Sequence, residues 1–256
     1  MPISPKRMPF MGHLAELRKR LTVVIAVVAT LAIGGYFFAG QIYTLLVAPL
    51  QKVLGDNPAV TLKLLEAMGI RFKLGMWGGV IASSPVIIWE ALAFFLPALK
   101  PKERKWFVWT FIAAVVLFLA GAAFCYFFML EPSAMWLAGQ NGDLFTYMPT
   151  GADLVTVSMY FILGFGIAFE VPVVVFYLVY FQVVPYDKLR KNWRVVWVVL
   201  ATLAAMITPD WSPVTMGALA AAMIALFEGS MALVRILLSR KIKAQREAFG
   251  FDEDED

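Results

Sequence analysis

The sequence Phe10-Met11-Gly12-His13-Leu14-Ala15-Glu16-Leu17-Arg18-Lys19-Arg20-Leu21 places a basic cluster and one carboxylate, Glu16, directly before a long apolar run. Positive charge beside a membrane span keeps that end of the span in the cytosol. The apolar run extends from Leu21 to about Leu46, whereas the apolar core of a cleaved signal peptide has only about 7–15 residues. No clear small-residue cleavage site follows the run. The stretch therefore predicts a retained first membrane span, and the carboxylate of Glu16 needs a separate explanation.

The composition indicates that lipid is the solvent for most of the chain. Hydrophobic residues make up 61% of the sequence and charged residues 16%, whereas the apolar share of soluble domains is about 45–50%. The apolar residues are gathered into runs, and about 20 helical residues cross a bilayer core. A single cysteine, Cys125, and a single histidine, His13, predict neither a disulfide nor a metal site. We expect an all-α polytopic membrane protein that has no cofactor and binds no nucleic acid.

The apolar runs predict six spans. They cover residues of about 21–46, 72–96, 106–130, 154–184, 194–208 and 213–236. The fourth run is interrupted by Glu170 and Pro172, and the dipeptide at 131–132, Glu-Pro, is expected to end the third. Between the first two runs, apolar residues at 62, 65 and 68 have helical spacing, which predicts a short amphipathic helix at the membrane interface. Gly75 and Gly79 predict close helix packing.

The distribution of basic residues orients this arrangement. Of the 22 Lys and Arg, only Lys52, Lys63, Arg71 and Lys73 fall in or beside the first outer loop, which leaves 18 for the inner segments. The positive-inside rule then puts both termini in the cytosol. Residues 1–238 are expected to form the membrane domain, and residues 239–256 a charged, disordered cytosolic tail. The last two spans are predicted to be short, about 22 Å and about 21 Å of apolar helix, which would thin the bilayer locally.

Acidic residues that are candidates for function lie inside a predicted span and on the cytosolic face. Glu170 lies in the middle of the fourth run, where a charged acid costs about 3 kcal/mol; it is either a site that faces a cavity or partner, or a protonated acid that holds helices together. Glu16 and Glu103 share the cytosolic face. They either make local ion pairs, Glu16 with Arg20, or form a carboxylate pair for a dication, for which the planar fork of arginine is best suited. Spacing alone favours local pairing. Glu90 would snorkel or pair with a neighbouring base.

The order of several motifs resembles the TatC family, the signal-peptide receptor of the twin-arginine protein translocase. The motifs are His13-Leu14-x-Glu16-Leu17-Arg18-x-Arg20-Leu21, Lys73-Leu74-Gly75, Ser84-Pro85-Val86, Phe94-x-x-Pro97-Ala98-Leu99 with Glu103-Arg104, Phe165-Gly166-x-x-Phe169-Glu170-x-Pro172, Thr208-Pro209-Asp210 and Phe227-Glu228. Each motif alone is weak, but their order and spacing across six spans are specific. The resemblance covers the chain from about residue 10 to residue 235.

The resemblance implies a cup-shaped, six-helix protein in the plasma (inner) membrane of a prokaryote, and no enzyme activity. Such a protein would bind the paired arginines of signal peptides on folded cargo. It would assemble with TatA-type and TatB-type single-span subunits, contact membrane lipid, self-associate, and support export driven by the proton-motive force. The implied signal-peptide-binding residues are Glu16, Glu103, Phe94, Pro49, Arg18 and Arg104. The implied intramembrane partner residues are Glu170, Thr208, Asp210, Thr215 and Glu228.

Some positions depart from the family pattern. The usual double proline of the last outer turn is replaced by Thr208-Pro209-Asp210, and Thr215 is the nearest match to the usual glutamine of the sixth span. Glu90 stands where glutamine is expected. A proton-coupled transporter that uses Glu170 as a relay is the alternative, but such folds often repeat one half in the other, and the halves here differ. A membrane enzyme is a third alternative, which no acid pair, histidine cluster or nucleophile elbow supports.

Overall fold

The protein is described by a computed structural model, which covers residues 10–54, 59–94, 105–140, 149–181, 183–208, 212–239 and 242. Within these ranges the chain is helical, and the only β contact is an isolated parallel bridge between Val60 and Thr150. The all-α prediction is therefore confirmed. Of the predicted tail only Ser239 and Ile242 are described, and Ile242 is buried in the core. The rest of the tail, Glu103, Arg104 and Asp210 lie outside the described residues.

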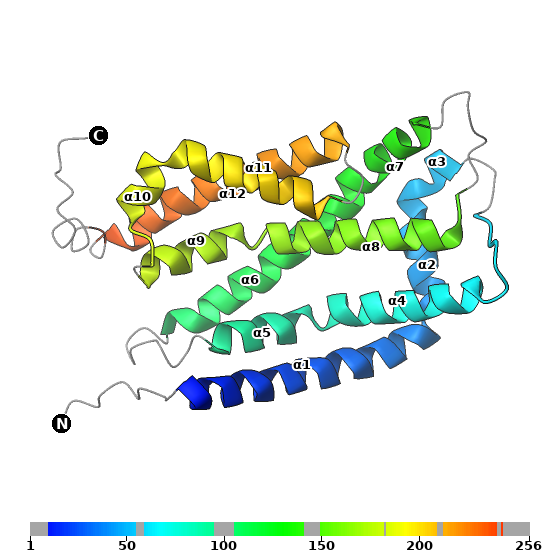
Figure 1. The fold of residues 1–256 in the computed structure, drawn as a ribbon, viewed down its shortest axis with the longest axis horizontal. Coiled ribbons are helices and arrows are strands. Elements are labelled where there is room, and N and C mark those ends of the chain that lie inside the picture. The colour runs from blue at the N-terminus through cyan, green and yellow to red at the C-terminus, as the bar shows by residue number, and fades with distance from the viewer. Residues whose placement is uncertain are drawn as a thin grey trace.

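Figure 1 shows the order of the helices along the chain. They are α1 (Phe10–Phe37), α2 (Ala39–Val47), the 3-10 turn η1 (Ala48–Leu50), α3 (Gln51–Leu54), α4 (Glu66–Ala82), α5 (Ser84–Phe94), α6 (Lys105–Phe124), the π-helical turn η3 (Cys125–Met129), α7 (Leu130–Gly139), α8 (Gly151–Ala168), α9 (Val171–Tyr180), α10 (Tyr186–Lys191), α11 (Trp193–Ile207) and α12 (Pro213–Leu237).

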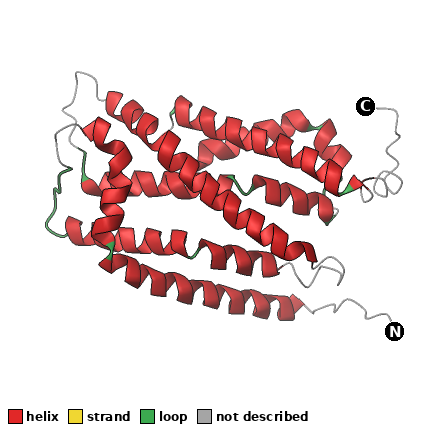
Figure 2. Ribbon diagram, turned by 180° about the vertical axis from the view of Figure 1, so that it is seen from behind, coloured by secondary structure: helices red, strands yellow, loops and turns green. Residues whose placement is uncertain are grey.

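The helices pack as a row that one helix crosses. The row runs from α1 through α4 and α5 to α8 and α9, with α11 and α12 beyond, and α6 crosses it diagonally (Figures 1 and 2). The central helix α8 supplies the core, where Val155, Phe161 and Phe165 are almost fully buried. Because α8 contacts helices on several sides, it is the scaffold on which the other helices are placed.

The described residues contain four helices that are long and apolar enough to cross a bilayer, or five if α4 and α5, which are bent by 51°, form one span. The bent pair breaks at Ser83, just before Pro85, and α8 ends at a turn of residues 169–170 before Pro172. That second interruption is where the sequence predicts it. The bounds of α11 also agree with the prediction to within one residue, and its 15 residues make it a short apolar helix. The count of six spans stays a prediction.

The first run does not form one span to residue 46. Helix α1 ends at Phe37, and α2 leaves it at a steep angle (Figures 1 and 2). A straight helix over 21–46 would be about 39 Å long, more than the roughly 30 Å of a bilayer core. The predicted interfacial helix is wrong as well. The Glu66 carboxylate accepts the backbone N–H groups of Leu62 and Lys63, at 2.6 and 3.1 Å, which folds these residues into a turn before α4 begins.

One predicted helix end and one predicted span length are also wrong. The third span does not end at Glu131 and Pro132, because α6, η3 and α7 form one continuous helix to Gly139. Proline disturbs a regular helix through its missing N–H and its clash with the carbonyl four residues before it, and the wider π turn η3 lies at that point and accommodates it. The bounds predicted for the sixth span agree with α12 to within one residue, but the helix is not short: it has 25 residues and continues past Glu228. The Glu228 carboxylate is paired with residues of other helices (below).

Three glycines bring α1 unusually close to α4. A Cβ atom on Gly75 would lie 2.7 Å from the backbone oxygen of Ala32, and one on Gly79 would lie 2.6 Å from the Ala32 nitrogen. On α1, Gly35 in turn faces the Gly75 backbone. The predicted close packing is therefore confirmed. It fixes the line along which α1 passes α4 and α5, and so the position of the polar residues at the start of α1.

Candidate functional site: a carboxylate–arginine–carboxylate cluster

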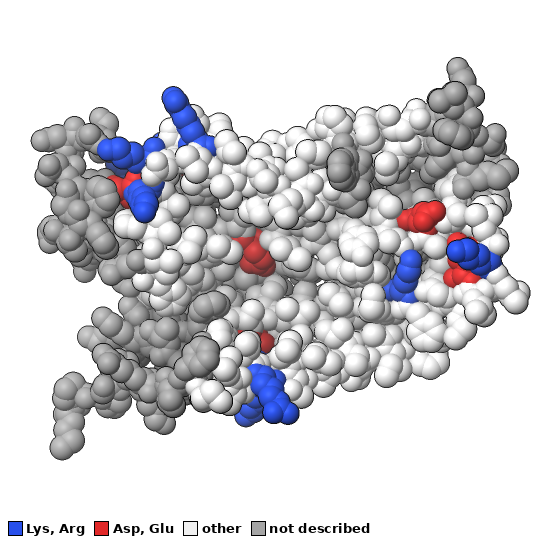
Figure 3. Space-filling model, in the orientation of Figure 1, with Lys and Arg blue, Asp and Glu red and all other residues white. Residues whose placement is uncertain are grey.

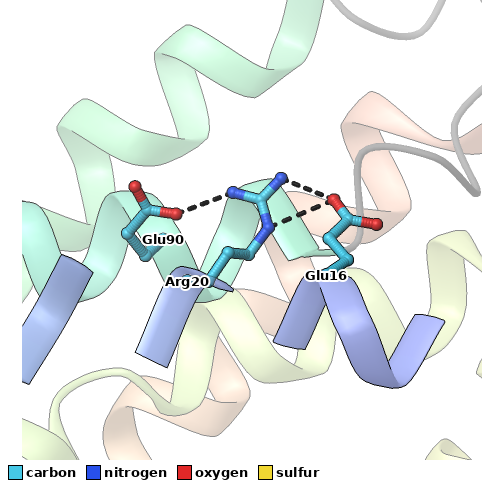
Figure 4. Close-up of polar contacts among 3 residues, drawn as sticks. All are labelled: Glu16, Arg20 and Glu90. Atoms are coloured by element: carbon cyan, nitrogen blue, oxygen red, sulfur yellow. Dashed lines mark hydrogen bonds and ion pairs between the residues drawn. The ribbon is translucent and has the colours of Figure 1, made fainter. Parts of the chain in front are cut away.

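Glu16, Arg20 and Glu90 form a hydrogen-bonded ion-pair network, called here the Arg20 cluster (Figure 4). Arg20 donates through Nε and Nη2 to the same oxygen, Oε1 of Glu16, at 3.2 and 2.7 Å. It donates through Nη1 to Oε2 of Glu90 at 2.8 Å. Residues four apart share one face of a helix, so Glu16 and Arg20 both face α5, which supplies Glu90.

The Arg20 cluster has more negative than positive charge, and more hydrogen-bond acceptors than its donors use. Two carboxylates face one guanidinium, so the cluster carries a net charge of about −1 when all three groups are ionised. The side chains of Glu16, Arg20 and Glu90 are 19%, 22% and 17% exposed. The second oxygen of Glu16, Oε2, is buried and accepts no hydrogen bond from the described residues. A buried acceptor without a donor is costly, and the described residues leave this one carboxylate oxygen unused.

The sequence predicts part of this cluster. The local pair of Glu16 with Arg20 and the pairing of Glu90 with a neighbouring base are both confirmed. That the neighbouring base is Arg20, 70 residues away in the chain, was not predicted, because it depends on how α1 packs against α5. The replacement of the expected glutamine by Glu90 was the available signal.

The other predicted signal-peptide residues are placed differently. Phe94 follows Glu90 by four residues on α5 and is half-buried, so it lies on the face of the Arg20 cluster. Arg18 is two residues from Glu16, about 200° around the helix, and lines an open groove on the outer surface of α1. Pro49 lies in η1, beyond the far end of α1, which is about 32 Å of helix from Glu16. The structure therefore does not bring Arg18 or Pro49 to the Glu16 carboxylate.

Glu170 lies at the turn between α8 and α9, halfway along the bundle. Its side chain is half-buried, and its Oε1 atom is buried without a hydrogen-bond partner among the described residues. Figure 3 shows acidic atoms midway along this face, where α8 meets α9, surrounded by uncharged residues. One oxygen of this carboxylate is therefore an acceptor that the described residues leave unused.

The remaining predicted partner residues make contacts within the chain. Glu228 accepts a hydrogen bond from Arg190 at 2.9 Å and one from the indole of Trp197 at 3.2 Å. It therefore joins α12 to α10 and α11. The hydroxyl of Thr208 donates to the Ala204 carbonyl. Thr215 is buried, and its hydroxyl donates to the Ser212 carbonyl, 3.2 Å away.

Comparison with known proteins identifies the family. The family model described as Sec-independent protein translocase protein (TatC) matches residues 12–221. The chain belongs to the TatC family. The TatC protein of Carboxydothermus hydrogenoformans is 27% identical over 244 residues, which cover 95% of this chain and 100% of the relative. That of Deinococcus radiodurans is 30% identical over 232 residues, covering 89% of this chain and 86% of the relative.

A solved structure agrees with this assignment. The crystal structure of a twin-arginine translocase receptor, TatC, matches with a TM-score of 0.74 at 29% identity, covering 88% of this chain and 98% of that one. The TatC family is one of multi-pass membrane translocase components and not of enzymes, so the membrane-enzyme alternative is excluded. The Arg20 cluster lies inside the segment that the TatC model matches, whereas Glu228 lies beyond it.

Proposed function

We propose that this chain is the receptor and scaffold subunit of a twin-arginine translocase, and that Glu16 binds a guanidinium of the signal peptide. The observation that carries this proposal is the Oε2 atom of Glu16, which is buried and accepts no hydrogen bond from the described residues. We assign the missing donor to an arginine of the peptide, because the chain belongs to the TatC family and a solved relative is a twin-arginine translocase receptor. Phe94, one helical turn from Glu90, is proposed to provide an apolar surface for the peptide. Glu103 and Arg104, which lie outside the described residues, are proposed as further peptide contacts.

Arginine fits this acceptor better than lysine for two reasons. The planar guanidinium presents donors in a rigid fork that a carboxylate can accept, whereas an ammonium is a compact, strongly hydrated point charge. Both side chains make charge-assisted hydrogen bonds to a carboxylate, but the guanidinium can make two in parallel to its two oxygens. Because the Arg20 cluster is negative before the peptide arrives, a second guanidinium is accommodated without leaving excess positive charge near the membrane.

Peptide binding to the detergent-solubilised protein tests the proposal. We expect a fluorescently labelled signal peptide with paired arginines to bind, and the same peptide with paired lysines to bind at least about tenfold more weakly, which corresponds to about 1.4 kcal/mol. Glu16→Gln removes the charge but keeps the shape, and should weaken binding of the arginine peptide. Glu131→Gln, an acid of α7, is the matched control. Equal affinity for both peptides would refute the receptor assignment.

We further propose six spans with both termini in the cytosol, so that the start of α1, the end of α5 and α10 share the cytosolic side. Basic residues at α10 and at the start of α1 support this orientation. Because Cys125 is buried, maleimide labelling of a single introduced cysteine can be measured without interference from it. We expect an impermeant maleimide to label Leu62→Cys in intact cells and Lys188→Cys only after permeabilisation. The reverse pattern would invert the topology.

Glu170 is proposed as the intramembrane contact for single-span partners of the TatA and TatB types. Its free carboxylate oxygen is a strong acceptor in a low-dielectric environment, where a donor from a partner helix would be worth more than in water. The transport energy is expected to come from the proton-motive force. Glu170→Ala should leave peptide binding intact and change the pattern of crosslinks to the partners, and an unchanged pattern would assign Glu170 a structural role only.

A further inference from the structure

We infer that Arg20 is a resident competitor for the Glu16 carboxylate, and that Glu90 is the acceptor that retains Arg20 when a peptide guanidinium takes Glu16. This inference rests on the proposed function and concerns the regulation of the same site. Arg20 would thus set how tightly the peptide binds, by occupying part of the site while the peptide is absent.

The division of the hydrogen bonds supports an exchange. Two donors of Arg20, Nε and Nη2, are used on Glu16, and a separate one, Nη1, is used on Glu90. Arg20 can therefore release Glu16 and keep its bond to Glu90. A guanidinium that is only 22% exposed is costly to leave without a counterion, and Glu90 supplies that counterion throughout the exchange.

Arg20 binds only one of the two carboxylate oxygens of Glu16. Both donors converge on Oε1, and Oε2 receives nothing from the described residues. The stronger arrangement of a guanidinium with a carboxylate uses both oxygens in parallel. A peptide arginine can begin at the vacant Oε2 and then take Oε1 in the bidentate arrangement, which displaces Arg20 towards Glu90.

The charge count gives Glu90 a defined part in this exchange. With Glu90 present, the cluster changes from about −1 to neutral when one guanidinium binds. With a neutral glutamine at this position it would change from neutral to about +1, and the two guanidinium groups would repel each other with a single carboxylate between them. Glu90, the residue that departs from the expected glutamine, therefore favours peptide binding, whereas Arg20 opposes it.

Replacing Arg20 and replacing Glu90 should change the affinity for the peptide in opposite directions, and this difference tests the inference. The dissociation constant of the paired-arginine peptide is measured for the wild-type protein and for Arg20→Gln, Glu90→Gln and Lys19→Gln. Lys19 is an exposed neighbour on the outer face of α1, so its variant reproduces the loss of one positive charge without freeing Glu16. We expect Arg20→Gln to bind about threefold to tenfold tighter, Glu90→Gln to bind more weakly by a similar factor, and Lys19→Gln to stay within about twofold.

Weaker or unchanged binding by Arg20→Gln would overturn the inference, because Arg20 would then position Glu16 instead of competing for it. Should Arg20→Gln fail to fold, Arg20→Lys keeps the charge and the stem but not the fork, and we expect it to bind tighter than wild type. The proposed function fails separately, when the wild-type protein does not prefer the arginine peptide to the lysine peptide. A wild-type preference without tightening in Arg20→Gln removes only this inference.

Discussion

Replacing Gly75 by alanine tests the packing on which the Arg20 cluster depends. The new Cβ atom would lie 2.7 Å from the Ala32 carbonyl oxygen and 2.9 Å from the Tyr36 nitrogen, whereas ordinary van der Waals contact begins at 3.4 Å. The shortfall at Ala32 is 3.4 minus 2.7, or about 0.7 Å, and the opposing atoms are backbone. Because no flexible side chain can yield, α1 itself has to move away from α4.

Overpacking of this kind costs about 1–3 kcal/mol. For a chain of this size each kcal/mol lowers the melting temperature by about 2–4 °C, so Gly75→Ala should melt about 2–12 °C below a glycine-to-alanine variant that lacks this contact. The measurement is thermal unfolding of the detergent-solubilised protein, followed by tryptophan fluorescence.

Gly34→Ala is the matched control, because a Cβ atom on this glycine of α1 meets nothing within 4 Å. Alanine is favoured over glycine in a helix by about 1 kcal/mol, and both variants share this gain, so the difference between them isolates the contact with α4. We expect Gly34→Ala to be as stable as the wild type or more stable. If the two variants melt together, the close approach of α1 to α4 is wrong, and with it the placement of Arg20 beside Glu90.

Three further variants probe contacts outside the Arg20 cluster. Glu228→Ala leaves Arg190 and the Trp197 indole without their acceptor, and should lower stability by about 1–3 kcal/mol in the same melting assay; Arg190→Ala, which removes only a largely exposed partner, should cost less. Tyr126→Phe loses the 2.7 Å hydrogen bond to the Leu45 carbonyl, which is worth about 1 kcal/mol. This loss should speed proteolysis in α2, and an unchanged rate of proteolysis would contradict the bond. Glu170→Gln should not lower the melting temperature, since burial of a charged acid is itself costly; a large loss would reveal a structural ion pair.

The parts of the fold that could be predicted are those decided by local sequence. The bounds of α11 follow from an apolar run between a basic segment and a turn, and the break at residues 169–170 follows from an acid and a proline inside an apolar run. The family motifs depend on order and spacing, which the sequence contains in full. The family assignment could therefore be made before the structure, and the comparisons confirm it.

The parts that could not be predicted depend on contacts between distant segments. Hydropathy does not distinguish a long span from a helix that turns at Phe38, because both are apolar. Pro132 normally ends a helix, and only the π turn before it lets α7 continue. The link from Arg20 to Glu90 requires the glycine contacts of α4 with α1, and no spacing rule reports it. The position of Glu16 changes accordingly, from an exposed helix pair to a half-buried carboxylate with one oxygen that the described residues leave unused.

The most direct test of the central claim maps where the arginine pair binds. A signal peptide with a photoreactive residue next to its paired arginines is crosslinked to the solubilised protein, and the adducts are located by mass spectrometry. We predict adducts in the first turns of α1, at residues 10–20, and at the end of α5, at residues 90–94. Adducts confined to η1, α3 and the start of α8, at the opposite end of the bundle, would contradict the assignment of Glu16 as the acceptor.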